Sequence, residues 1–168
     1  HRQSMKKKNI LFENPNAEES SQESEVLQIK QKHNKQCDDS ELIEQCIRKN
    51  FFMSSLEKQA RNEIIKEMSL AYVDKGTVIF EQGHYGNYFY IVKEGEIALS
   101  INHKQVKTIT KGESFGELAL LHGAPRTGTC TAITKCYLWV MKRKNFKKII
   151  EHISRLNFEE NKTFLQTI

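Results

Sequence analysis

Apolar and polar positions divide the chain into three parts. Residues 1–36 are rich in Glu, Ser, Lys, Asn and Gln, a composition that predicts a polar, largely flexible leader, in which Val26 to Lys32 could form a turn or two of helix. Residues 38–69 carry apolar side chains at helical spacing, which predicts a pair of helices. From Leu70 to Met141 the apolar positions alternate and glycines come at short intervals, as in short strands joined by turns. We therefore expect a β-barrel to begin where the pattern changes, at Leu70.

Polar residues that cap helices precede both members of the helical pair. The sequence predicts the N-cap of the first helix among Asp38, Asp39 and Ser40. It predicts the N-cap of the second helix at Ser54 or Ser55.

Strand-like runs recur about every ten residues from 70 to 141, which indicates a sandwich or barrel of jelly-roll type. A helical segment at 142–168 follows, with an apolar face from about Arg143 to His152. The predicted fold class is α+β, mainly a β jelly-roll barrel with flanking N- and C-terminal helices, in one domain at 37–168. The expected strands are Tyr72–Val73, Thr77–Phe80, Tyr88–Val92, Glu96–Ile101, Gln105–Ile109, Thr129–Ile133 and Cys136–Met141.

Composition narrows the function classes. No apolar run approaches the ~20 residues that span a bilayer, and no apolar stretch follows the lysines after Met5, so neither a membrane span nor a signal peptide is expected. The four cysteines show no C-x-x-C spacing, which argues against a zinc site and a disulfide framework. We therefore expect a cytoplasmic protein with reduced thiols. The net charge of +5 fits an anionic partner without selecting one.

Other charged features are interpreted as surface. The basic residues at 142–148 lie on a helix whose other face is apolar, so a solvated helix face is favoured over a nucleic-acid site. His84 and His122 stand beside glycines without a carboxylate or cysteine cluster, so no metal site is expected. The basic and hydrophobic segment Lys6–Phe12 fits either an inhibitory segment or a solvated tail, and the tail is favoured.

The break between strands, Gly112–Thr129, carries the candidate chemistry. Gly116 allows close approach of the backbone to a ligand, and one or two helical turns follow, whose N-terminus suits an anion. Arg126 offers a guanidinium fork that matches phosphate oxygens. The ionised Glu117 carboxylate accepts hydrogen bonds and so suits ligand hydroxyls. Together these groups predict a site for a sugar phosphate.

This break reads GESFGELALLHGAPRTGT at 112–129. It resembles the phosphate-binding cassette of the cyclic nucleotide-binding domain family, F-G-E-[LA]-A-L…P-R-[TA]-[AG]-T. The stretches GTVIFEQG at 76–83 and YFYIVKEG at 88–95 are similar to the family's barrel signatures. The resemblance covers roughly residues 55–154, with the matched positions in the right order.

Two further stretches, at 6–12 and 157–165, resemble the first nucleotide-binding domain of cGMP-dependent protein kinases, particularly protist ones. This implies a cytoplasmic regulatory domain that controls a linked serine/threonine kinase domain, with further nucleotide-binding domains in the same chain. A cAMP-binding regulatory subunit and the nucleotide-binding domain of an ion channel stay as alternatives. We expect no catalysis here, because the sequence has no glycine-rich kinase loop, no H-R-D or D-F-G, and no nucleophile with an adjacent base.

The resemblance also implies a role for each cassette residue. Glu117 would bind the ribose 2′-hydroxyl and Arg126 the cyclic phosphate. The phosphate cradle would be completed by the backbone of Gly116, Leu118 and Ala119.

Thr127 is the residue that should select the base. In this family, Thr or Ser after the arginine is associated with cGMP, because its hydroxyl can bond both the phosphate and the guanine 2-amino group. Domains selective for cAMP usually carry Ala there. One hydroxyl contributes about 1–3 kcal/mol, so cGMP is expected to be preferred over cAMP as the allosteric ligand. Gly128 replaces the commoner Ala, with little expected effect. The sequence identifies neither the residue that caps the base nor the oligomeric state.

Overall fold

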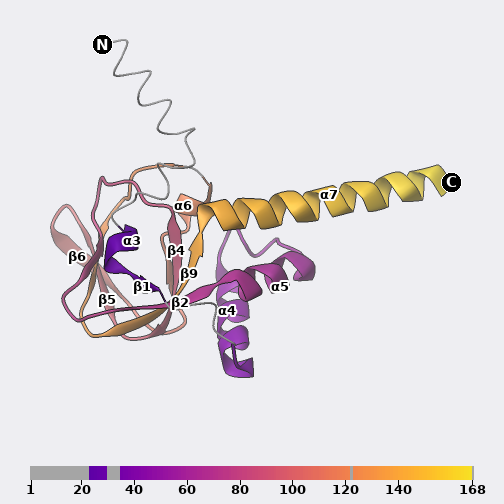
Figure 1. Ribbon diagram of the computed structural model, residues 1–168. Helices are drawn as coiled ribbons and strands as arrows, with labels where there is room; N and C mark the ends of the chain where they lie inside the picture. The colour runs from indigo at the N-terminus through magenta and orange to yellow at the C-terminus, as the bar shows by residue number, and fades with distance from the viewer. Residues whose placement is uncertain (1–22, 30–34, 122, 168) are drawn as a thin grey trace, which may run out of the picture.

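The computed structural model describes residues 23–29, 35–121 and 123–167, and a barrel of two antiparallel sheets lies at one end of it (Figure 1). The strands are β1 (Gln28–Ile29), β2 (Ser69–Val73), β3 (Val78–Phe80), β4 (Tyr88–Glu94), β5 (Ile97–Ile101), β6 (Lys104–Ile109), β7 (Ser114–Phe115), β8 (Thr129–Ala132) and β9 (Cys136–Lys142). Within the described residues, one sheet has the order β1-β2-β9-β4-β7 and the other β3-β8-β5-β6. The predicted jelly-roll barrel and its α+β class are confirmed.

The alternation of side chains explains why β4 lies inside the five-stranded sheet. Tyr88, Tyr90 and Val92 pack in the core between the two sheets. Phe89 and Ile91, on the opposite face, pack with residues of the helices. Because successive side chains of a strand point to opposite faces, a strand buried on both faces must be apolar throughout. The YFYIV run meets that condition, and all five side chains are at most 2% exposed.

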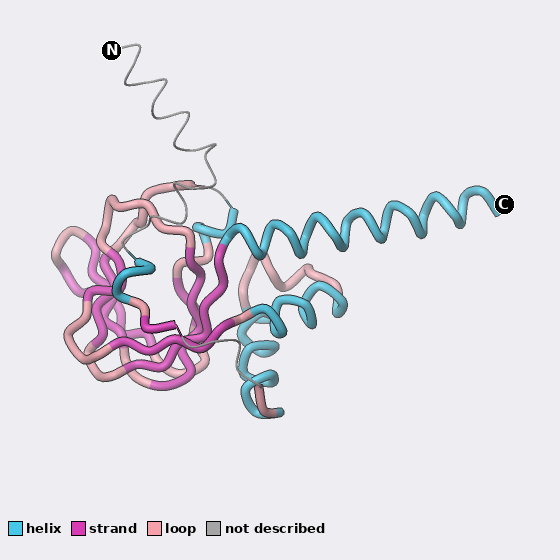
Figure 2. Tube along the Cα trace, in the orientation of Figure 1, coloured by secondary structure: helices cyan, strands magenta, loops and turns pink. Residues whose placement is uncertain are grey.

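Helices gather on one side of the barrel (Figure 2). They are α4 (Cys37–Lys49), α5 (Lys58–Glu67), α6 (Leu118–Leu121) and α7 (Arg143–Thr167), whereas α3 (Glu23–Val26) lies within the barrel ring. Their apolar sides form a second core cluster with the five-stranded sheet, around the fully buried Trp139. The C-terminal helix is present as predicted, and it extends beyond the barrel (Figure 1).

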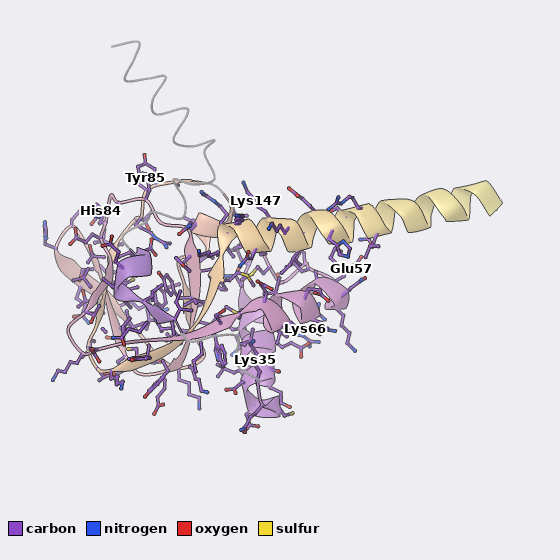
Figure 3. The ribbon with its side chains drawn as sticks, viewed as in Figure 1. Lys35, Glu57, Lys66, His84, Tyr85 and Lys147 are labelled. Carbon is purple, nitrogen blue, oxygen red and sulfur yellow. The ribbon has the colours of Figure 1, made fainter. Side chains whose placement is uncertain are left out.

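The basic residues near the start of α7 follow the solvated-face interpretation with one exception. Lys144, Lys147 and Lys148 are exposed, and Figure 3 shows Lys147 on the side of α7 that faces away from α5. Arg143 differs, because it is only 6% exposed. Its backbone N–H donates to the carbonyl oxygen of Asn87 at 2.8 Å, which joins the start of α7 to the start of β4.

The predicted N-caps are wrong for both α4 and α5. Gln36 caps α4, and its backbone N–H donates to Oδ2 of Asp39 at 3.2 Å, so Asp39 lies in the first turn instead of at the cap. Glu57 is the N-cap of α5, because Ser54 and Ser55 belong to the turn before it. The serine hydroxyls donate to carbonyl groups three residues earlier, at 3.2 and 3.4 Å. Residues of the types that cap helices stand near both helix starts, but Asp39 lies in the first turn of α4 and the two serines bond within the turn before α5.

The prediction of a flexible leader is wrong for the described part of residues 1–36. α3 and β1 are folded onto the barrel, with β1 paired to β2. Leu27 is 6% exposed and packs in the core between the sheets. Composition could not predict this, because one leucine and one buried carboxylate anchor the segment instead of an apolar pattern. Lys6–Phe12 lies outside the described residues, so the choice between an inhibitory segment and a solvated tail stays a prediction.

Candidate ligand-binding site

A cavity of about 220 Å³ opens beside α6, between β7 and β8. Side chains of the four-stranded sheet form its apolar wall, including Phe80, Leu99 and Ile109. The cassette forms the opposite side. The structure brings together all six residues that the sequence singled out for ligand binding: Gly116, Glu117, Leu118, Ala119, Arg126 and Thr127.

The turn from β7 into α6 requires glycine at position 116. Gly116 has a φ of +79°, a conformation that L side chains rarely adopt. A Cβ there would also lie 2.8 Å from Nη1 of Arg126 and 3.2 Å from the carbonyl oxygen of Tyr88. The turn is closed by the Ala119 N–H, which donates to the Gly116 carbonyl oxygen at 3.2 Å. The Ala119 amide is therefore engaged inside the cassette in this structure.

Arg126 is the buried charge of the site, with a side chain 5% exposed. Its Nη2 donates to the carbonyl oxygen of Tyr88 at 2.8 Å, and its Nη1 donates to that of Gly116 at 3.3 Å. The guanidinium carbon lies 4.0 Å from the centre of the Phe80 ring, a cation–π contact. Backbone hydrogen bonds at 2.8 Å fix the residue to the loop at 83–84. The guanidinium is thus held in the cavity wall by contacts within the chain.

A residue outside the sequence-predicted site supplies the counter-charge. Nη2 of Arg126 donates to Oε1 of Glu23 at 2.5 Å, and the hydroxyl of Tyr90 donates to the same oxygen at 2.5 Å. The Glu23 side chain is 4% exposed. Burial raises the pKa of its carboxyl group above the ordinary value, and the charge of Arg126 offsets part of that rise. No sequence signal marked Glu23, because it is one of many acidic residues in a polar stretch.

The family model of the cyclic nucleotide-binding domain matches residues 70–152, which include the whole cavity lining. Residues 70–152 belong to that family. The match begins within β2, so α3 and β1 lie outside the part of the chain that it covers.

Known proteins similar to this chain include protein kinases and their regulatory subunits. A cGMP-dependent protein kinase of Plasmodium berghei is 32% identical over 163 residues, 97% of this chain and 19% of that protein. A cAMP-dependent protein kinase regulatory subunit of Eremothecium gossypii is 36% identical over 108 residues, 64% of this chain and 24% of that protein. The regulatory domain of Toxoplasma gondii PKA, solved with cAMP, aligns with a TM-score of 0.61 and 31% identity, covering 79% of this chain and 52% of that one. The chain therefore spans only part of each relative.

Further polar residues also line the cavity. Glu117 is half-buried and Thr127 is exposed, so both are accessible from the cavity. Lys107, which sequence reasoning missed, also lines the cavity, and its Nζ lies 2.6 Å from Oε2 of Glu113. This hydrogen bond from Lys107 lowers the pKa of Glu113. Lys107 had no signal in the sequence, because it lies on β6 away from the cassette.

Replacing Gly128 by alanine is expected to destabilise the domain, contrary to the small effect expected from the sequence. A Cβ there would lie 2.8 Å from Cδ1 of Leu99 and 3.0 Å from the carbonyl oxygen of Ser100. The leucine can rotate, but the carbonyl belongs to β5, which pairs with β8. We expect the free energy of unfolding to fall by about 1–2 kcal/mol in urea denaturation. Thr127→Ala, at an exposed neighbour, should change it by less than about 0.5 kcal/mol. Equal stability of both variants would contradict this packing argument.

The described residues contain no group of three or more His, Cys, Asp and Glu side chains that could hold a metal ion. His84 lies 3.4 Å from a carboxylate oxygen of Glu81, as an exposed pair. His122 lies outside the described residues. All four cysteines are free. In the part of the chain that the structure describes, no helix combines the length and apolar character needed to cross a membrane.

Proposed function

We propose that this chain is a cGMP sensor that controls a linked serine/threonine kinase domain. The observation that carries the proposal is the buried guanidinium of Arg126, held in the wall of a cavity whose opposite side is the nucleotide-binding cassette. A buried cation with several kcal/mol of desolvation cost requires an anionic partner, and in this structure the Glu23 carboxylate is that partner. In a cyclic nucleotide-binding domain, the cyclic phosphate of the ligand is such a partner.

Each group of the cassette has a role in this proposal. Arg126 donates to the phosphate oxygens, and the backbone of Gly116, Leu118 and Ala119 lines the phosphate cradle. For the Ala119 amide to reach a phosphate, its bond to the Gly116 carbonyl must open or be shared. Glu117, half-buried at the rim, accepts a hydrogen bond from the ribose 2′-hydroxyl.

Thr127 supplies the preference for guanine in this proposal. Its hydroxyl is exposed at the cavity rim, where it can donate to a phosphate oxygen and accept from the guanine 2-amino group. Adenine has no amino group at that position, so cAMP gains only the first of these bonds. The Plasmodium berghei relative, named as a cGMP-dependent kinase, supports this choice.

Packing of the short helix α6 suggests how binding is communicated. Leu120 of α6 is 1% exposed and belongs to the same apolar cluster as Phe146 of α7. A phosphate that reorganises the cassette therefore shifts a side chain on which α7 rests. We infer that α7 is the element that a neighbouring kinase domain senses. The proposal also includes further nucleotide-binding domains in the protein that carries the kinase domain, because this chain spans only 19% of the kinase relative. A cytoplasmic location of this chain stays a prediction.

A cAMP-binding regulatory subunit is the second candidate. The Eremothecium gossypii relative is named as such a subunit and is 36% identical. The Toxoplasma gondii domain with cAMP has a similar fold and 31% identity. Both candidates use the same cavity and the same arginine, and they differ at the base.

Calorimetric titration with cGMP and with cAMP tests the proposal. We expect the unaltered chain to bind cGMP about tenfold more tightly, which corresponds to one hydrogen bond to the base. Thr127→Ala should remove this difference by weakening cGMP binding. Thr108→Ala is the matched control, since Thr108 lies on β6 beside cavity residues but does not line the cavity. Tighter binding of cAMP by the unaltered chain would favour the second candidate, and binding of neither nucleotide would refute both.

A further inference from the structure

The segment before the nucleotide-binding domain enters the barrel and reaches the arginine of the site. Figure 1 shows α3 inside the barrel ring, apart from the other helices. Glu23, the first residue of α3, contacts Arg126, which is 103 residues later in the chain. Gly86 makes room for this contact, because a Cβ at that position would collide with the Glu23 carboxylate. The segment is therefore fitted to the binding site.

The carboxylate of Glu23 uses the donor that a phosphate would need. Nη2 of Arg126 donates both to Glu23 and to the carbonyl oxygen of Tyr88, and Nη1 donates to Gly116. A carboxylate and a cyclic phosphate are both singly charged acceptors for a guanidinium. They cannot occupy the same donor at full strength together. The cavity lined by Arg126 and the cassette, about 220 Å³, is also smaller than the roughly 300 Å³ at which pockets for small ligands begin.

The contact is built so that a better acceptor can displace it. Among the described residues, Oε2 of Glu23 and Nε of Arg126 have no hydrogen-bond partner, although both are buried. The pair is therefore joined through one nitrogen only, and a phosphate that bridges Nε and Nη2 satisfies more of the guanidinium. Burial also raises the pKa of Glu23, so the ionised group is held at an electrostatic cost.

The rest of the segment is attached weakly enough to leave. β1 contributes two residue pairs at the edge of the five-stranded sheet, Gln28 with Tyr72 and Ile29 with Ala71. Leu27 is the one side chain of β1 and its preceding turn that enters the barrel core. Releasing residues 23–29 exposes this leucine and breaks a short edge pairing, but it leaves the paired strands of the barrel intact.

We propose that Glu23 is a built-in competitor of the cyclic nucleotide, which holds Arg126 in the empty domain and is expelled with residues 23–29 when the ligand binds. This inference rests on the proposed function, because it assigns the regulation of the same site. A competitor on the same chain acts at a high effective concentration, so the domain opens only when the nucleotide outcompetes it. Expulsion also gives the ligand a second output, at the N-terminal side of the barrel, besides α7.

Glu23→Gln tests the competition, because it keeps the shape of the side chain and removes its charge. We expect this variant to bind cGMP on the order of tenfold more tightly than the unaltered chain in calorimetry. Glu25→Gln is the matched control, an exposed glutamate in the same helix, and it should bind as the unaltered chain does. Equal affinity of the Glu23 variant and the unaltered chain would overturn this inference and leave the proposed function standing. An equal gain in both variants would overturn it too, because a general charge effect would then explain the gain.

Hydrogen exchange of the unaltered chain tests the expulsion without any substitution. We expect backbone amides of residues 23–29 to exchange faster when cGMP saturates the site, although ligands usually slow exchange. Unchanged or slower exchange in that segment would overturn the inference. If no cyclic nucleotide binds to any of the three proteins, the proposed function and this inference fail together.

Discussion

Arg126→Ala is expected to remove nearly all binding of cyclic nucleotides, lowering the affinity by at least about a hundredfold. The guanidinium is the buried cation of the cavity wall, and its loss leaves the phosphate with only the backbone amides and the Thr127 hydroxyl as donors. The substitution also leaves the Glu23 carboxylate without its charged partner, so the negative charge near the site repels the ligand when the segment stays inserted. Calorimetry or competition against a fluorescent nucleotide measures the loss.

Two comparison variants make the Arg126 result specific. Arg126→Lys keeps the charge but loses the fork, so its affinity should lie between those of the alanine variant and the unaltered chain. Arg48→Ala removes an exposed arginine on α4, with a side chain 62% exposed, and should leave binding unchanged. Nucleotide affinity that survives Arg126→Ala would show that the phosphate binds elsewhere.

Trp139→Ala is expected to cost the domain about 3–5 kcal/mol of unfolding free energy. Trp139 lies on β9, is 0% exposed and packs in the apolar cluster between the five-stranded sheet and the helices. Lys35 and Lys93 lie over its ring, at 5.1 and 5.3 Å from the centre, so the side chain also joins residues before and within the barrel. Urea denaturation, followed by circular dichroism and by tyrosine fluorescence, measures the loss.

The same experiment tests whether helices and barrel form one cooperative domain, as the sequence predicts for residues 37–168. A single transition, with both probes coincident, is expected for both proteins. Phe51→Ala provides the matched control, because this aromatic side chain is 78% exposed and should change stability by less than about 0.5 kcal/mol. Two separate transitions in the unaltered chain would show that the helices and the barrel unfold independently.

The sequence predicted the barrel well, because strand burial follows simple periodicity. The alternation in β8 and the continuous apolar run of β4 each correspond to one burial pattern in the structure. The six cassette residues converge on one cavity because they are close in sequence and Gly116 fixes the turn between them.

What the sequence could not predict depends on contacts between distant residues. Glu23 meets Arg126 across 103 positions, and one acidic residue in a polar leader carries no periodic signal. Gly128 is confined by β5, a neighbour that its own sequence context does not reveal. Lys107 reaches the cavity from β6 for the same reason. Local patterns predict elements, whereas such pairs are set by how the sheets come together.

A crystal structure of this chain with cGMP is the measurement that tests the central claim most directly. We predict the cyclic phosphate within hydrogen-bonding distance of Arg126, the ribose 2′-hydroxyl on Glu117, and the guanine 2-amino group beside Thr127. In the same crystal, Glu23 should have left the guanidinium. Nucleotide density away from Arg126, or an unchanged Glu23–Arg126 pair beside a fully occupied cavity, would contradict the site that is proposed for this domain.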